Sequence, residues 1–140
     1  MTCELRHIGI VVNDISRYEI FLKKIGFVVF YDETEGGLDI KNLLNLDVEI
    51  KIKKLKNECN NIIEILKYPK QKNSGEASPN TTGLNHVAMT VSDLDETIQI
   101  FLESGGELIG EIVEKENVKL CYIFDIERNI FELVEECEEY

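Results

Sequence analysis

The chain has 140 residues, of which 44% are hydrophobic, and its formal net charge is −12. This length and composition suit one globular domain with an ordinary core and argue against a disordered chain. The negative charge argues against nucleic acid and anionic membranes as partners, because both bind positive surfaces. No apolar run approaches the roughly 18–20 residues that span a bilayer, and the N-terminus lacks a signal-peptide pattern, so we expect a cytosolic protein.

The cysteines give no sign of a zinc site or a disulfide framework. Cys3, Cys59, Cys121 and Cys137 lack the short paired spacing of zinc and redox motifs. Without a secretory signal, disulfides are not expected either. We therefore predict free thiols.

The first half of the chain predicts a β-α-β-β-β module with a small inserted helix. An apolar strand over residues 5–12 leads to a helix over residues 15–25, capped either by Ser16 with Glu19 or by Asp14. The remaining predicted elements are a strand over residues 27–31, a helix over 38–46, a strand near 48–53 with its lysines in water, a turn over 57–61 and a strand over 62–68.

The second half repeats this plan after a linker over residues 69–83, which is rich in Lys, Ser, Asn, Gly and Pro. The predicted elements are a strand over 84–91, a helix over 94–104 capped by Asp93, and strands over 107–115, 118–125 and 129–135. We therefore expect a single domain over residues 1–140. Its parts would be module 1 (1–68), the linker (69–83) and module 2 (84–140).

Each module opens on a strand with a histidine and closes on a strand with a glutamate. The chain has two histidines, and His7 and His86 stand at the same point of the repeat. Glu64 and Glu132 stand at corresponding points of the closing strands. Because side chains alternate faces along a strand, all four residues lie opposite the apolar face that fits the helix. An ionisable residue near the middle of an apolar strand is costly to bury, unless the four meet.

Two imidazoles and two carboxylates form a donor set for a divalent transition metal, and octahedral binding would leave two positions for water or substrate. A single histidine in the middle of a strand is more often a satisfied core residue than a ligand. Four such residues in symmetric register favour ligation. We therefore predict one divalent ion, Ni, Co, Mn or Zn, held by His7, Glu64, His86 and Glu132.

The sequence resembles the vicinal oxygen chelate superfamily, which includes glyoxalase I, methylmalonyl-CoA epimerase, extradiol dioxygenases and bleomycin-resistance proteins. The resemblance lies in His7 of HIGIVV, Glu64 of IIEILKY, His86 of NHVAMTV and Glu132 of NIFELVE. It implies an α+β fold in which two tandem βαβββ modules form a curled mixed sheet around a metal site, and it implies a homodimer. One departure is the segment 127–129, where relatives usually carry a glycine-containing turn.

Two carboxylates favour the branch that resembles glyoxalase I and methylmalonyl-CoA epimerase, because extradiol oxygenases typically use two histidines and one carboxylate. We predict a metal-dependent isomerase, epimerase or lyase that moves a proton next to the carbonyl of a small molecule, through a metal-bound enediolate. Glu64 or Glu132 would be the catalytic base. The alternatives are a non-catalytic binder of small molecules such as antibiotics, and an Fe(II) extradiol-type dioxygenase. The pocket neighbours are expected to include Val11, Ala88, Met89 and Thr90.

Overall fold

The structure is a computed structural model that describes residues 1–137. The last three residues of the predicted second module, 138–140, lie outside the described residues. The contacts divide the chain into two units, Met1–Asn73 (unit 1) and Ser74–Tyr140 (unit 2), and the boundary falls in the predicted linker. No helix within residues 1–137 is long and apolar enough to span a bilayer.

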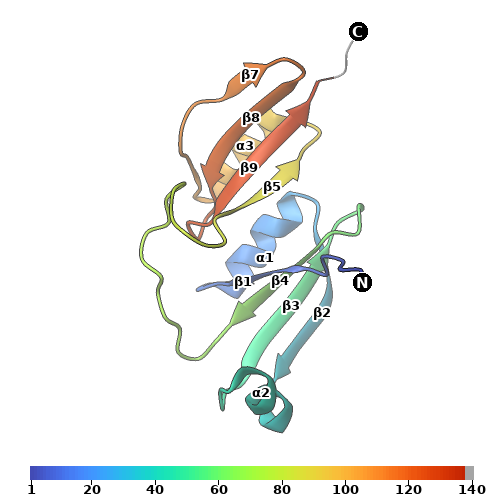
Figure 1. Cartoon of the computed structure of the whole chain (residues 1–140), viewed down its shortest axis with the longest axis vertical. Coiled ribbons are helices and arrows are strands. Elements are labelled where there is room, and N and C mark those ends of the chain that lie inside the picture. Colours follow the sequence, from blue (N-terminus) through green and yellow to red (C-terminus); the bar gives the residue numbers. More distant parts are fainter. Residues whose placement is uncertain (138–140) are drawn as a thin grey trace. The chain divides into compact units, whose positions relative to one another are not determined.

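Unit 1 is a four-stranded sheet with α1 lying across one face and α2 at the far end of β2 and β3 (Figure 1). Its elements are β1 (Ile8–Val11), α1 (Ile15–Lys24), β2 (Val28–Glu35), α2 (Gly37–Leu44), β3 (Ile50–Lys56) and β4 (Ile62–Lys67). The strand order is β1-β4-β3-β2, with β1 parallel to β4 and the other neighbours antiparallel. The predicted module with an inserted helix is confirmed.

Unit 2 repeats the plan, with α3 against one face of its sheet (Figure 1). Its elements are β5 (His86–Thr90), α3 (Leu94–Ser104), β6 (Glu107–Leu108), β7 (Val113–Lys115), β8 (Val118–Phe124) and β9 (Ile130–Glu136). The strand order is β5-β9-β8-β6, β7 also pairs with β8, and β5 runs parallel to β9. The α+β fold built from two such modules is therefore confirmed.

The prediction of one strand over residues 107–115 was wrong, because β6 and β7 are separate. Leu108 pairs with Ile123 and Val113 with Leu120. The chain therefore advances by five residues from Leu108 to Val113 where β8 advances by three, and the two extra residues bulge out of the sheet. Gly110 lies in this bulge, where a Cβ would meet no atom within 4 Å.

Both long helices begin at an aspartate. Asp14 accepts a hydrogen bond from the backbone N–H of Arg17 at 3.0 Å, so Asp14 is the cap of α1. Asp93 caps α3 in the same way, through the N–H of Glu96 at 2.9 Å. A side-chain oxygen at this position satisfies an N–H that has no partner within the helix. The second of the two predicted caps of α1 is thus the correct one.

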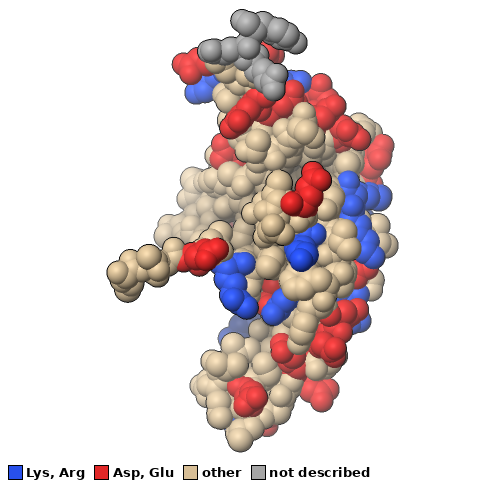
Figure 2. Space-filling view, turned by 90° about the vertical axis from the view of Figure 1, so that its right-hand side faces the viewer, with Lys and Arg blue, Asp and Glu red and all other residues tan. Residues whose placement is uncertain are grey.

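The two units differ in charge. Residues 1–73 contain twelve Lys and Arg against eleven Asp and Glu, a net charge of +1. Residues 74–140 contain three against sixteen, a net charge of −13. In the upper part of the face shown in Figure 2, acidic side chains predominate. The net negative charge of the chain therefore originates in unit 2.

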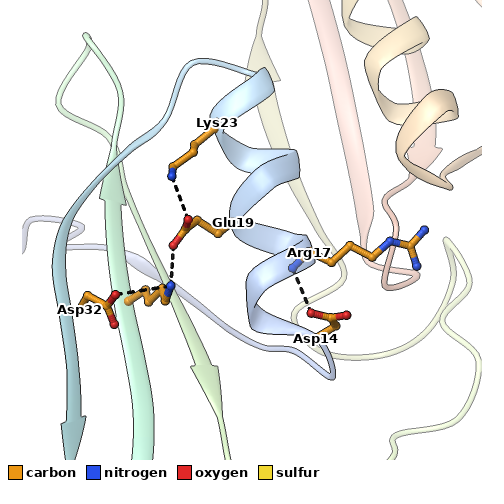
Figure 3. A network of polar contacts seen from close by, with 6 residues as sticks. Asp14, Arg17, Glu19, Lys23 and Asp32 are labelled. Atoms are coloured by element: carbon orange, nitrogen blue, oxygen red, sulfur yellow. Dashed lines mark hydrogen bonds and ion pairs between the residues drawn. The ribbon is translucent and has the colours of Figure 1, made fainter.

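One predicted surface lysine is buried. Lys53 is 9% exposed, and its Nζ lies 2.6 Å from Glu19 Oε1 and 3.5 Å from Asp32 Oδ2. Figure 3 shows Glu19 on α1 beside Lys23, whose Nζ lies 2.8 Å from Glu19 Oε2. The prediction that Lys53 is in water was wrong, because Lys53 lies on the face of β3 that meets α1, and Glu19 of α1 supplies its counterion.

Candidate metal centre

In unit 1, His7 and Glu64 lie on the same side of the sheet. Glu64 is on β4 directly beside Gly9 of the parallel strand β1, and His7 lies one residue before β1 begins. His7 Nε2 is 3.8 Å from Glu64 Oε1, and the side chains are 29% and 15% exposed. Because Gly9 has no side chain, nothing on β1 stands between the imidazole and the carboxylate.

Unit 2 holds the equivalent pair. Glu132 is on β9 directly beside Ala88 of the parallel strand β5, and His86 is the first residue of β5. His86 Nε2 is 3.4 Å from Glu132 Oε2, and the side chains are 32% and 22% exposed. Each His is thus a diagonal neighbour of its Glu across a parallel strand pair, with a small residue between them.

Two details of the predicted site are corrected. The histidines lie at the start of their strands, whereas we expected all four residues near the middle. Met89 pairs with buried Leu133, so it faces the helix side and not the ligand side. Val11, Ala88 and Thr90 are exposed and share the ligand side of their strands, as expected.

Within its described residues, neither unit alone gathers three His, Cys, Asp or Glu side chains that could hold a metal ion. Each unit brings together one predicted His with one predicted Glu. A site with all four ligands needs the His–Glu pair of a unit 1 together with the His–Glu pair of a unit 2. Such a site stays a prediction.

The hydrogen bonds of Asn85 define which nitrogen of His86 carries the proton. The amide nitrogen of Asn85 donates to the backbone oxygens of Ser78 at 2.9 Å and Thr81 at 3.1 Å. The amide oxygen is therefore the atom that lies 3.1 Å from His86 Nδ1, so Nδ1 is the donor. In the neutral ring this leaves the lone pair of Nε2 directed at the Glu132 side, which is the arrangement of a metal-binding histidine.

The two glutamates have different neighbours. Lys54, directly opposite Glu64 on β3, places Nζ 3.8 Å from Glu64 Oε2 and 4.8 Å from the ring centre of Tyr31. Tyr122 lies directly opposite Glu132 on β8, and its hydroxyl donates a hydrogen bond to Glu132 Oε2 at 3.2 Å. Burial and this hydrogen bond raise the pKa of Tyr122 above its usual value, so the phenol is a neutral donor.

The donor atoms fit a divalent transition metal. Imidazole nitrogen and carboxylate oxygen each bind such an ion at about 2.0–2.2 Å, so two donors of one ion lie at most about 4.3 Å apart. The separations of 3.8 Å in unit 1 and 3.4 Å in unit 2 are within that limit. The side chains are partly exposed, and in the neutral ring of His86 the lone pair lies on Nε2, so an ion has both access and a donor.

Three residues of the site were missed by sequence reasoning. Asn85 immediately precedes His86, and an amide beside a candidate ligand was a usable signal. Lys54 and Tyr122 become neighbours of the glutamates only through the antiparallel register of β3 with β4 and of β8 with β9. No motif in the sequence marks either residue.

A family model described as Glyoxalase/Bleomycin resistance protein/Dioxygenase superfamily matches residues 6–123. A glyoxalase family protein from Bacillus cereus is 26% identical with a TM-score of 0.91, over 99% of this chain and 97% of that one. None of the curated proteins compared with the chain matches it significantly.

Two further solved structures share the fold at lower identity. The fosfomycin resistance protein FosX from Listeria monocytogenes, complexed with Mn(II) and sulfate, is 20% identical with a TM-score of 0.67, over 99% of this chain and 93% of that one. A glyoxalase family protein from Enterococcus faecalis is 23% identical with a TM-score of 0.66, over 94% and 97%. The similarities confirm the fold that the paired modules predicted.

Proposed function

The chain belongs to the glyoxalase/bleomycin resistance protein/dioxygenase superfamily, and from this premise we propose that it is a metal-dependent isomerase, epimerase or lyase. It would move a proton on a carbon beside a carbonyl group of a small molecule. The observation that carries the proposal is the contact of His86 Nδ1 with the amide oxygen of Asn85, which leaves the lone pair of Nε2 in the neutral ring beside Glu132. The Mn(II) in the FosX structure supports a divalent ion as the cofactor.

His7, Glu64, His86 and Glu132 would hold the ion. When bound, a divalent ion stabilises negative charge that develops on the carbonyl oxygen. Glu132 is the more firmly held carboxylate, because Tyr122 donates to it and His86 lies 3.4 Å away. The nearest ionisable neighbours of Glu64, His7 and Lys54, are both 3.8 Å away, so Glu64 has more freedom to move. We therefore assign Glu64 as the base that takes the proton and Glu132 as a fixed ligand.

Metal binding is the first test of this proposal. The purified, tag-free protein should bind one Co(II), Ni(II), Mn(II) or Zn(II) per set of four ligands in equilibrium dialysis. His86→Gln and Glu132→Gln should each lose most of the bound ion. Glu103→Gln, an exposed carboxylate on α3, is the matched control and should bind as the parent does. Absence of binding at micromolar metal would leave the small-molecule binder as the better interpretation.

The class of reaction is tested by isotope exchange. A panel of small carbonyl compounds, incubated with the metal-loaded protein in heavy water without oxygen, should include one that takes up deuterium beside its carbonyl. Glu64→Gln should slow this exchange about 100-fold or more while keeping most of the metal, because it removes the base. Turnover that consumes O₂ in step with substrate would identify an Fe(II) oxygenase and contradict the proposal.

We also propose a homodimer, which the resemblance to the superfamily implies; the four ligands, two in each unit, can then be assembled within one chain or between two. Light scattering should give twice the mass of one chain, and a monomer at working concentration would contradict this. Mixing His7→Ala chains with Glu132→Ala chains distinguishes the two arrangements of the site. Activity regained on mixing indicates sites shared between chains, and no recovery after chain exchange indicates sites within one chain.

A further inference from the structure

Unit 2 contains a hollow of about 380 Å³ beside its His–Glu pair. The bulge between β6 and β7 forms one wall, β8 forms the floor, and the linker adds Pro79. The lining residues are Pro79, Ile109, Gly110, Glu111, Val113, Lys115, Leu120, Cys121 and Tyr122. Most of them are apolar, which is the usual character of a small-molecule pocket.

Tyr122 connects this hollow to the predicted metal ligands. Tyr122 lines the hollow, its hydroxyl donates a hydrogen bond to Glu132 Oε2 at 3.2 Å, and its ring centre is 5.1 Å from that of His86. The remainder of a molecule whose polar end contacts His86 and Glu132 would therefore lie near the hollow.

The charge around the hollow restricts what it can accept. Unit 2 has a net charge of −13, and Glu111 is itself part of the lining. Lys115 is the one cation among the lining residues. An anionic group would be repelled by this surface, and a cationic group would lose its hydration against the apolar floor. An uncharged apolar group is disfavoured by neither effect.

We propose that this hollow binds an uncharged apolar substituent, aromatic or branched, of the carbonyl substrate whose polar end lies at the His86–Glu132 pair. The proposal rests on the proposed function and names its substrate class. The size agrees with it, since an apolar cavity of about 150 Å³ holds one benzene molecule. A hollow of 380 Å³ has room for a two-ring group.

The experiment uses two fluorescent dyes with the same aromatic body. Phenylnaphthylamine is neutral, and anilinonaphthalene sulfonate carries a negative charge. The chain has no tryptophan, so protein emission does not interfere with either dye. The full chain should bind the neutral dye saturably and more tightly than the anionic dye. Preference for the anionic dye would overturn the proposal.

Two neighbouring substitutions locate the binding site. Val113 lines the hollow and is 49% exposed, whereas Ile112 does not line it and is 40% exposed. Both tolerate a charge without loss of folding because both side chains reach solvent. Val113→Glu should lower the affinity for the neutral dye at least about tenfold, because it places a carboxylate against the bound dye. Ile112→Glu should change its affinity by less than about twofold.

Metal affinity of the same variants separates the two proposals. Retained metal binding with loss of dye in Val113→Glu supports the hollow as a subsite. Equal dye binding by Val113→Glu and the parent overturns the subsite and leaves the metal enzyme in place, and equal loss in both variants overturns it too. A parent chain that binds dye but no metal rejects the proposed function instead.

Discussion

Lys54 and Tyr122 occupy equivalent positions in the two units, each directly opposite the predicted metal-binding glutamate of its own sheet. Lys54 brings a positive charge to within 3.8 Å of Glu64, whereas Tyr122 donates a neutral hydrogen bond to Glu132 at 3.2 Å. The internal symmetry of the fold is therefore broken at the residue best placed to influence each carboxylate. A cation and a phenol have opposite effects on a nearby divalent ion.

This asymmetry predicts metal affinities that move in opposite directions. Tyr122→Phe keeps the ring but removes the hydrogen bond that orients Glu132, so affinity should fall about tenfold. Lys54→Met removes a positive charge beside Glu64, so affinity should rise about three- to tenfold at low ionic strength. Titration calorimetry with Mn(II) or Co(II) measures both changes.

The matched control for Lys54→Met is Lys56→Met, on the same strand, where the cation lies 5.5 Å from the ring centre of Phe30. This variant should leave metal affinity within about twofold of the parent. A fall in affinity for Lys54→Met would contradict the electrostatic argument.

The tautomer of His86 can be measured without metal. Nitrogen NMR of isotopically labelled histidine should show His86 protonated at Nδ1 in its neutral form, because the oxygen of Asn85 accepts that proton. Asn85→Ala should convert the ring to a mixture of tautomers and weaken metal binding about tenfold. His7, for which the described residues show no Nδ1 partner, is the internal comparison and should not respond. A His86 ring protonated at Nε2 in the parent would refute the assignment.

The network around Lys53 predicts an acid-sensitive contribution to the stability of unit 1. Hydrogen bonds from Lys23 and Lys53 hold the pKa of Glu19 below its usual value. A lowered pKa stabilises the fold above the pKa of the unfolded chain, near 4.5, and this contribution is lost as pH falls through the folded value.

Glu19→Gln should therefore lower the free energy of unfolding by about 2 kcal/mol at about pH 7, because it leaves Lys53 buried without its closest counterion. The difference from the parent should shrink as pH drops below about 4. Urea titrations at several pH values measure this difference. Glu103→Gln on α3 is the control, and its free energy of unfolding should stay within about 0.5 kcal/mol of the parent. A difference that stays constant down to low pH would show that the ion pair is not its source.

The thiol of Cys121 should be unreactive in the folded chain. Burial raises its pKa to about 11, and its residue is 2% exposed. A thiol reagent at about pH 8 should modify the exposed Cys3 and Cys59 first and Cys121 only after unfolding, because the thiolate is the reacting form. Rapid modification of all four cysteines under native conditions would contradict the burial.

The raised pKa of the Cys121 thiol also makes the stability of the fold depend on pH. The buried thiol stabilises the fold fully below the pKa of the unfolded chain, near 9, and this contribution is lost as pH rises toward about 11. Alkaline unfolding of Cys121→Ala should therefore be less steep in that range than unfolding of the parent. Parallel curves would show that other groups dominate.

The helices were predictable because short-range signals delimit them. Asp93 before the apolar period and Gly105 after it bound α3, and the glycine adopts φ 111°, a conformation that few other residues accept. The pairing of each His with its Glu was also predictable, because strand alternation and the repeat place both on one side of a sheet. The helix limits depend on residues close together in sequence, and the His–Glu pairs depend on the repeat of the modules.

Features that neither a local signal nor the repeat marks were not predictable. The burial of Lys53 depends on a helix residue 34 positions away, and the split between β6 and β7 depends on how both pair with β8. The turn before β9 forms without glycine. Arg128 has φ 68°, and the side chain of Asp125 accepts hydrogen bonds from the N–H groups of Glu127 and Asn129. A carboxylate thus stabilises this turn without the glycine that the family resemblance led us to expect.

The bulge between β6 and β7 has a consequence for how this chain can change over generations. The register of β5 with β9 positions the His86 and Glu132 donors, and the bulge takes no part in that register. Mutations and insertions in the bulge can therefore accumulate without displacing either donor. Natural selection can reshape what the molecule accepts while its chemistry is inherited unchanged.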